Sequence, residues 1–177
     1  MPIVERLEHL PNSTLKISEE YREFLPSIIL NSLNDPLLRS ITPRDAERFR
    51  DTESALAFLG DRTVYTISNE DTLAGLIWFS EKKWPLNLPN SPRFTYAIRM
   101  YKPFRGAGLA APFSTKVVED FTRKHLGEPL WLETNSDNAT AIHLYEKTGW
   151  RKRGEYKPEE HRTRLVMTYG LEDYKTI

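Results

Sequence analysis

The sequence of 177 residues contains no cysteine. This absence excludes a structural disulfide, a thiolate nucleophile and a zinc site with cysteine ligands. Covalent catalysis would therefore need another nucleophile. Metal-ligand spacing is also lacking among the four histidines, so we expect no metal site. These histidines are His9, His125, His143 and His161.

An excess of charge of one sign is absent too, because lysine plus arginine and aspartate plus glutamate each number 25. Without a basic excess, no field gathers nucleic acid or an anionic membrane surface, and we expect neither as a partner. The opening residues, MPIVERLEHLPNS, lack the basic patch and apolar core of a secretory signal, and no apolar run approaches membrane-spanning length. We therefore expect a cytoplasmic protein.

The composition is that of a folded protein, with 39% apolar and 28% charged residues. The twelve prolines are scattered, apart from a concentration in residues 84–92, and no linker is evident. A chain of this length suits one hydrophobic core. We expect a single domain over residues 1–177.

Two helical segments are predicted in the first third of the chain. Residues 18–34 begin with a serine cap and acidic residues and then place apolar residues at helical spacing around Pro26, which would kink or divide the helix. Residues 43–59 follow Thr42 as N-cap and end at Gly60, in one piece or two.

The remaining elements follow from β-rich runs and from one amphipathic stripe. Two β-rich runs separated by residues 69–71 indicate a hairpin. Apolar residues alternate in the next strand and recur every fourth position from Gly108 to about His125. The predicted strands are 62–68, 72–80, 94–101, 129–134 and 164–170, and the predicted later helices are 108–125 and 139–149.

The turn KPFRGAGLAA joins the strand 94–101 to the next helix. Gly106 and Gly108 can adopt left-handed backbone conformations and allow a ligand to approach closely. The first amides of the helix, its dipole and the Arg105 guanidinium would all attract a phosphate group.

Three interpretations compete for this turn. It is a plain strand-to-helix turn, a dinucleotide-binding fingerprint or an acyl-CoA site. Gly106, Gly108 and Ala111 fit the fingerprint, and Glu133 fits its ribose-binding acid. However, that fold begins with this unit and needs several further strand–helix repeats, whereas here several elements precede the turn.

Two motifs resemble the GNAT superfamily of acyl-CoA N-acyltransferases. Arg105-x-x-Gly108-x-Ala110 matches its Gln/Arg-x-x-Gly-x-Gly/Ala pattern, whose amides hold the pyrophosphate of coenzyme A. Asn138-x-x-Ala141-x-x-Leu144-Tyr145-x-x-x-Gly149-Trp150 resembles a second segment at the usual separation. The resemblance implies a cofactor-binding core at about 94–150 and acetyl-CoA as acyl donor.

The resemblance also implies an α/β fold with three layers, in which helices flank a central, strongly twisted mixed sheet. The strands 94–101 and 130–134 would be parallel neighbours that splay apart to admit the pantetheine arm. Asn138 would cap its helix and also contact this arm. The implied cofactor-binding residues are Ile98, Arg99, Met100, Arg105, Gly106, Ala107, Gly108, Leu109, Ala110 and Asn138.

WLETNSDNATAIHLYEKTGW is similar to the branch that acetylates the N-terminal alanine of ribosomal proteins. This likeness implies Glu133 as the general base and Tyr145 as the acid that protonates the leaving thiolate. From the residues alone, the alternatives are that Tyr145 is a core aromatic and that Glu133 is a surface or capping carboxylate. Glu81 is a second candidate base.

The acceptor is a primary amine, on a small molecule or at a peptide N-terminus, if transfer occurs. The alternative is a regulatory domain that binds acyl-CoA without catalysis. Homodimers are common in the superfamily, so a homodimer is a further expectation. We expect Trp78, Trp84 and the loop 82–92 to border the acceptor pocket, because long connections often carry function.

Overall fold

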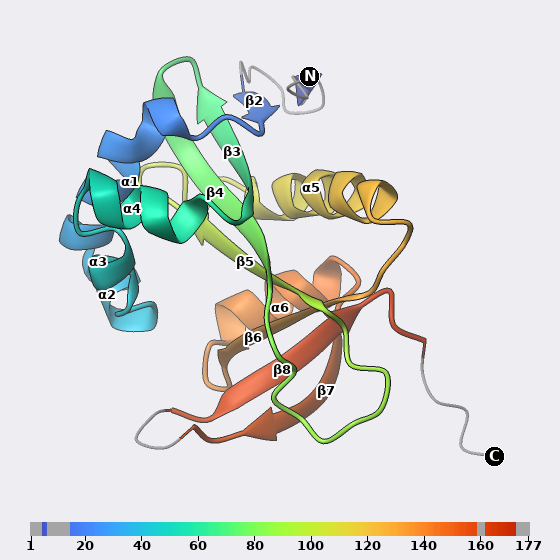
Figure 1. The fold of residues 1–177 in the computed structure, drawn as a ribbon. Coiled ribbons are helices and arrows are strands. Elements are labelled where there is room, and N and C mark those ends of the chain that lie inside the picture. The colour runs from blue at the N-terminus through green and yellow to red at the C-terminus, as the bar shows by residue number, and fades with distance from the viewer. Residues whose placement is uncertain (1–4, 7–14, 159–161, 173–177) are drawn as a thin grey trace. The chain divides into compact units, whose positions relative to one another are not determined.

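The computed structural model describes residues 5–6, 15–158 and 162–172 (Figure 1). The chain forms two compact units. The first unit is Met1–Phe79 with Ile98–Phe113, and the second is Ser80–Ala97 with Ser114–Ile177. Three elements, β4, β5 and α5, begin in one unit and continue into the other. The single domain over 1–177 stays a prediction.

The first unit contains an antiparallel sheet in the order β1-β2-β3-β4. The predicted hairpin is confirmed, with Glu70 in its turn at a φ of 51°. Five consecutive residues of β3 are buried, which is typical of a strand covered on both faces. The strands are β1 Glu5–Arg6, β2 Leu15–Ser18, β3 Thr63–Asn69 and β4 Thr72–Glu81.

Short helices of the first unit pack against α1. The helix predicted over 18–34 is wrong at its start, because Ser18 ends β2 and the α-helix begins only at Leu25. Pro26 lies in the first turn, where proline is tolerated, and so it does not kink the helix. The elements are η1 Arg22–Phe24, α1 Leu25–Asn34, α2 Pro36–Ile41, α3 Asp45–Arg48 and α4 Thr52–Leu59.

The second predicted helix is confirmed in two pieces, but its cap is wrong. Thr42 follows the end of α2, and its hydroxyl donates to the Leu38 carbonyl at 2.8 Å. The α2 and α4 helices are capped instead by the carboxylates of Asp35 and Asp51. Gly60 follows α4 as predicted.

The second unit contains both parallel and antiparallel strand pairs. Phe94 and Thr95 of β5 pair in parallel with Leu130 and Trp131 of β6, as predicted, whereas β8 is antiparallel to both β6 and β7. The divergence of β5 from β6 stays a prediction. The elements are β5 Phe94–Met100, α5 Ala110–Lys124, β6 Leu130–Asn135, α6 Ala139–Lys147, β7 Arg151–Tyr156 and β8 Arg164–Tyr169.

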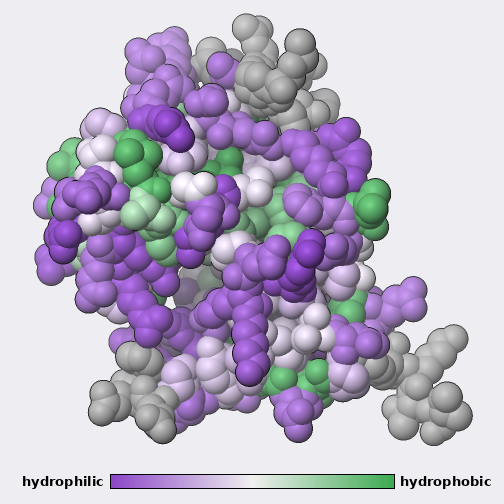
Figure 2. All heavy atoms as spheres, viewed as in Figure 1, coloured by the Kyte–Doolittle hydropathy of each residue, from purple (hydrophilic) through white to green (hydrophobic). Residues whose placement is uncertain are grey.

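The strand β7 was not predicted, because RKRGEY has no apolar alternation. It pairs with β8 along one side and ends the strand order, and charged residues are common on such edges. The strand β2 was missed as well, because its four residues are too few for a periodic signal. On the viewed face, hydrophilic side chains predominate (Figure 2).

The two faces of β6 carry different side chains, because successive strand residues point in opposite directions. Phe94 and Tyr96 of β5 contact Phe121 and Ser114 of α5, and they share a face with Leu130. The opposite face carries a buried cluster of Trp84, Trp131 and Val166, against which Leu86 and Tyr156 pack. In Figure 1 the loop after β4 passes in front of β8.

Candidate active site

The predicted phosphate-binding turn has the expected backbone. Gly106 and Gly108 have φ values of 77° and 75°, in the left-handed region that favours glycine. A Cβ at either position would meet no atom within 4 Å. The helix α5 begins at Ala110, so its unpaired first amides follow the turn directly. The backbone can therefore receive an anionic group.

The Arg105 guanidinium is engaged within the first unit. Its two terminal nitrogens donate to the two carboxylate oxygens of Asp35 at 2.6 and 3.1 Å. Asp35 is buried and also accepts from the Leu37 amide as the cap of α2. Burial by itself would raise the pKa of Asp35, but the hydrogen bonds from Arg105 and Leu37 outweigh it and lower this pKa. The turn is thus tied to α2.

A second arginine–carboxylate pair involves Arg99 of β5, the strand predicted to pair with the pantetheine arm. Arg99 donates to both oxygens of buried Asp45 at 2.5 and 3.1 Å, and its guanidinium lies 4.7 Å from the ring centre of Trp78. It also donates to the Ile98 carbonyl at 2.9 Å. Trp78 is buried against Phe49, so it packs in a core and gives no support to the predicted pocket role.

The partners of both arginines lie 54 and 70 residues away in the sequence. Sequence reasoning missed these pairs, because Asp35 and Asp45 stand at helix starts where acidic caps are common. Arg99 and Arg105 therefore stabilise the first unit through these ion pairs.

Asn138 caps α6 in the second unit, as predicted. Its side-chain oxygen accepts a hydrogen bond from the Ala141 amide at 3.2 Å. The predicted cofactor residues Ile98 to Met100 and Arg105 to Ala110 lie in the first unit, whereas Asn138 and the predicted catalytic pair lie in the second.

Tyr145 lies on α6 in an aromatic cluster. It is 7% exposed, and its ring centre is 6.2 Å from those of Tyr96 and Trp150. The Tyr96 hydroxyl shares a hydrogen bond of 2.8 Å with Ser114, and burial raises the pKa of Tyr96. Tyr145 therefore has a packing role, and its role as the acid stays a prediction.

Glu133 lies on the face of β6 that carries Trp131, opposite to the face shared with Tyr96. Its Oε1 accepts a hydrogen bond from the Lys82 ammonium at 2.8 Å, and its Oε2 accepts one from the Tyr156 hydroxyl. Burial by itself would raise the pKa of Glu133, but the hydrogen bonds from Lys82 and Tyr156 outweigh it, and the pKa lies below its ordinary value. The side chain is 21% exposed. Glu133 is thus an ionised carboxylate that solvent can reach.

Sequence reasoning missed Lys82 and Tyr156 as partners of Glu133. Tyr156 belongs to the unpredicted strand β7, and Lys82 is 51 residues away in the sequence. The other candidate base, Glu81, is 66% exposed and lies 3.9 Å from Arg93. Glu133 is the more buried carboxylate of the two, and the identity of the base stays a prediction.

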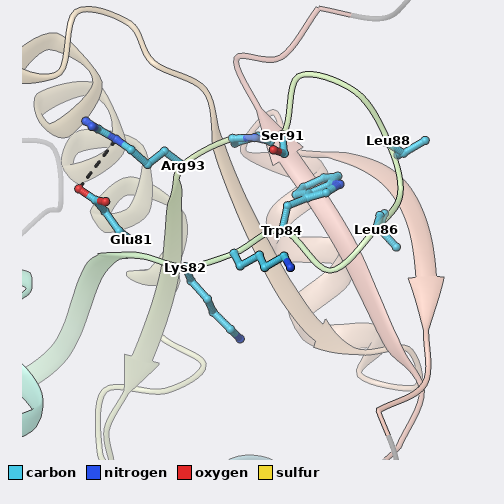
Figure 3. A pocket seen from close by; sticks show the side chains of 9 residues that line it. Glu81, Lys82, Trp84, Leu86, Leu88, Ser91 and Arg93 are labelled. Carbon is cyan, nitrogen blue, oxygen red and sulfur yellow. Dashed lines mark ion pairs between the residues drawn. The ribbon is translucent and has the colours of Figure 1, made fainter.

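The loop after β4 surrounds an open cavity of about 590 Å³ in the second unit (Figure 3). The Lys82 amide donates to the Arg93 carbonyl at 3.2 Å and so closes the base of the loop. Trp84 packs edge-on against Trp131, with ring centres 5.6 Å apart. Lining residues include Lys82, Lys83, Trp84, Leu86, Leu88 and Arg93.

Within the described ranges, no group of three or more histidine, aspartate or glutamate side chains is placed to hold a metal ion. His9 and His161 lie outside those ranges. Among the helices that the structure describes, none is long and apolar enough to cross a membrane.

Residues 26–150 match the family described as the acetyltransferase (GNAT) family. The chain is 22% identical over 147 residues to the SPbeta prophage-derived uncharacterized N-acetyltransferase YokL of Bacillus subtilis. The match covers 81% of this chain and 77% of YokL.

Two solved structures are similar in fold. The ribosomal-protein-S5-alanine acetyltransferase from Vibrio fischeri has a TM-score of 0.69 at 13% identity, over 94% of this chain and 95% of that one. The aminoglycoside acetyltransferase AAC(6')-Ib, in complex with coenzyme A, has a TM-score of 0.68 at 14% identity, over 88% and 94%. The predicted α/β class, with a mixed sheet and helices, is confirmed.

Proposed function

The chain belongs to the acetyltransferase (GNAT) family and is an N-acetyltransferase whose acyl donor is acetyl-CoA, and on this premise we propose that Glu133 accepts the proton of the acceptor amine. The observation that carries this proposal is the contact of 2.8 Å between Glu133 and an ammonium group, that of Lys82. A carboxylate that already binds one primary ammonium is suited to bind another.

The proposed reaction is a direct attack on the thioester. The amine nitrogen attacks the carbonyl carbon, the carbon–sulfur bond breaks, and an amide and the free thiol of CoA form. Because its pKa lies below the ordinary value, Glu133 is ionised at neutral pH and attracts the ammonium. One proton of the ammonium passes to Glu133, directly or through water, and this transfer frees the nitrogen lone pair before the carbon–nitrogen bond forms.

Tyr145 gives its proton to the thiolate in this proposal. Glu133 and Tyr145 lie against opposite faces of β6, with Glu133 beside Tyr156 and Tyr145 beside Tyr96. In this proposal the base acts on the amine and the acid acts on the sulfur.

The pyrophosphate of CoA would bind at the turn 105–110. Support comes from the left-handed Gly106 and Gly108, the open space at both, and the helix that follows. Backbone amides are the main donors in this proposal, because the Arg105 guanidinium is paired with Asp35. The pantetheine arm would pair with the backbone of Ile98 to Met100. A contact between this arm and Asn138 stays a prediction.

The acceptor amine is tested with a panel of amines and acetyl-CoA, with detection of free thiol and mass spectrometry of the product. The panel contains alkylamines, polyamines, aminoglycosides and peptides with free N-termini. We expect thiol release that depends on an amine. A domain that only binds acyl-CoA, which the family assignment does not favour, would bind CoA and release no thiol. The cytoplasmic location and the homodimer stay predictions.

A further inference from the structure

The ammonium of Lys82 lies in a cation site of the second unit. Its Nζ is 2.8 Å from Glu133 Oε1 and 5.4 Å from the ring centre of Trp131. An ionised carboxylate and the face of an indole ring both attract ammonium ions. The site is therefore built for a primary ammonium.

The Trp131 ring and the Glu133 carboxylate, which form this site, are held more firmly than the Lys82 side chain. Trp131 is fully buried and held edge-on by Trp84, and the Tyr156 hydroxyl donates to the second oxygen of Glu133. Burial and hydrogen bonds thus hold the ring and the carboxylate in place. A ligand meets them already oriented, which lowers the entropic cost of binding.

Lys82, by contrast, is only half buried. Its side chain is 50% exposed, and it reaches Glu133 on a flexible stem of four methylenes. In Figure 3 this side chain points away from those of Trp84, Leu86 and Leu88. Ion pairs as exposed as this one contribute about 0–1 kcal/mol to stability, so a competing ammonium can displace it at small cost.

We propose that Lys82 occupies the binding site of the acceptor's ammonium, and that the acceptor is a primary amine on an unbranched methylene carbon which displaces it. This inference rests on the proposed role of Glu133. The group that now fills the site is itself an ammonium on a methylene, at the end of an alkyl chain. A peptide N-terminus differs, because its α-carbon is branched beside the nitrogen.

The test uses two isomeric probes, n-butylamine and sec-butylamine, which share mass and charge and differ in branching beside the nitrogen. Lys82→Met keeps the stem and removes the ammonium. We expect the KM of n-butylamine to fall by up to about fivefold in this variant, since the competition that is removed is at most about 1 kcal/mol and a tenfold change corresponds to about 1.4 kcal/mol. We also expect a smaller gain for sec-butylamine.

Lys152→Met is the matched control. Lys152 forms an ion pair of 2.9 Å with Glu146 in the same unit, and its side chain is 53% exposed. This variant should leave both KM values unchanged. Adding Glu133→Gln to Lys82→Met should abolish the gain for n-butylamine.

A titration with n-butylammonium chloride, followed by NMR at the Trp131 indole N–H, separates this inference from the proposed function, because it needs no turnover. Tighter binding to Lys82→Met than to wild type supports the ammonium site even if no acetylation is detected. An unchanged or raised KM in an active Lys82→Met enzyme overturns the inference and leaves the acetyltransferase activity intact. An equal gain for both isomers overturns the preference for an unbranched carbon.

Discussion

The hydrogen bond from Tyr156 to Glu133 sets the acidity of the proposed base. This bond is one of the interactions that hold the pKa of Glu133 below its ordinary value, so Tyr156→Phe should raise that pKa. Because the proposed base must be ionised, we expect the acidic limb of the kcat/KM profile to move to higher pH, with little change at neutral pH. The measurement is kcat/KM against pH for the best amine of the panel.

Linkage predicts the stability of the same variant. A carboxylate whose folded pKa is lowered contributes stability that is present above its unfolded pKa, and this stability is lost as the pH falls through the folded pKa. In urea denaturation, the free energy of unfolding of Tyr156→Phe should therefore fall furthest below that of wild type at neutral pH. The difference between the two proteins should become smaller in acid. If its acidic limb coincides with that of wild type, the hydrogen bond does not tune the base.

The phenol of Tyr145 can be separated from its ring. Tyr145→Phe keeps the contacts with Tyr96 and Trp150 and removes only the hydroxyl. If the phenol protonates the thiolate, kcat should fall by about 10² to 10⁴ while the affinity for CoA stays near that of wild type. Turnover and CoA binding are measured at a temperature where the variant is folded. Nearly full turnover would identify Tyr145 as a packing residue alone.

At the scale of elements, the turn that leads into α5 is expected to bind CoA. Gly108→Val meets no protein atom at its Cβ, but its side chain fills the open space where phosphate oxygens would lie. We expect calorimetry to detect no CoA binding by this variant. The backbone cost of a non-glycine residue at positive φ is about 1–2 kcal/mol.

Gly127→Val is the control for the backbone cost of a non-glycine residue at positive φ. Gly127 also has a positive φ, 76°, and an open Cβ position, but it follows the end of α5 and not its start. This variant should lose a similar amount of stability and bind CoA normally. Wild-type affinity in folded Gly108→Val would contradict the proposed pyrophosphate site.

The path of the chain predicts cooperative unfolding of the two compact units. The elements β4, β5 and α5 each belong to both compact units, so neither unit can lose these elements independently of the other. With 5-fluorotryptophan in all four tryptophan positions, ¹⁹F NMR follows Trp78 in the first unit and the other three in the second. We expect one urea midpoint for all four. A separate midpoint for Trp78 would show two independently folding units.

Local features of the sequence determined the elements and the turn. The stripe of apolar residues at every fourth position predicted α5, the alternation in 94–101 predicted β5, and Gly106 and Gly108 adopt the predicted left-handed conformations. Each of these features depends on residues a few positions apart, whose geometry the backbone itself dictates. The family motifs are equally local, so the family assignment was also accessible from the sequence.

Which side chains meet depends on the tertiary structure. It paired Arg105 with Asp35, Arg99 with Asp45, and Glu133 with Lys82 and Tyr156. The charged segment of β7 forms a strand because it pairs with β8, and the local sequence pattern does not predict these hydrogen bonds. The physical reason is the same in each case. Partners 23 to 70 residues apart are brought together by sheet register and loop path, and a charged residue by itself does not indicate its partner.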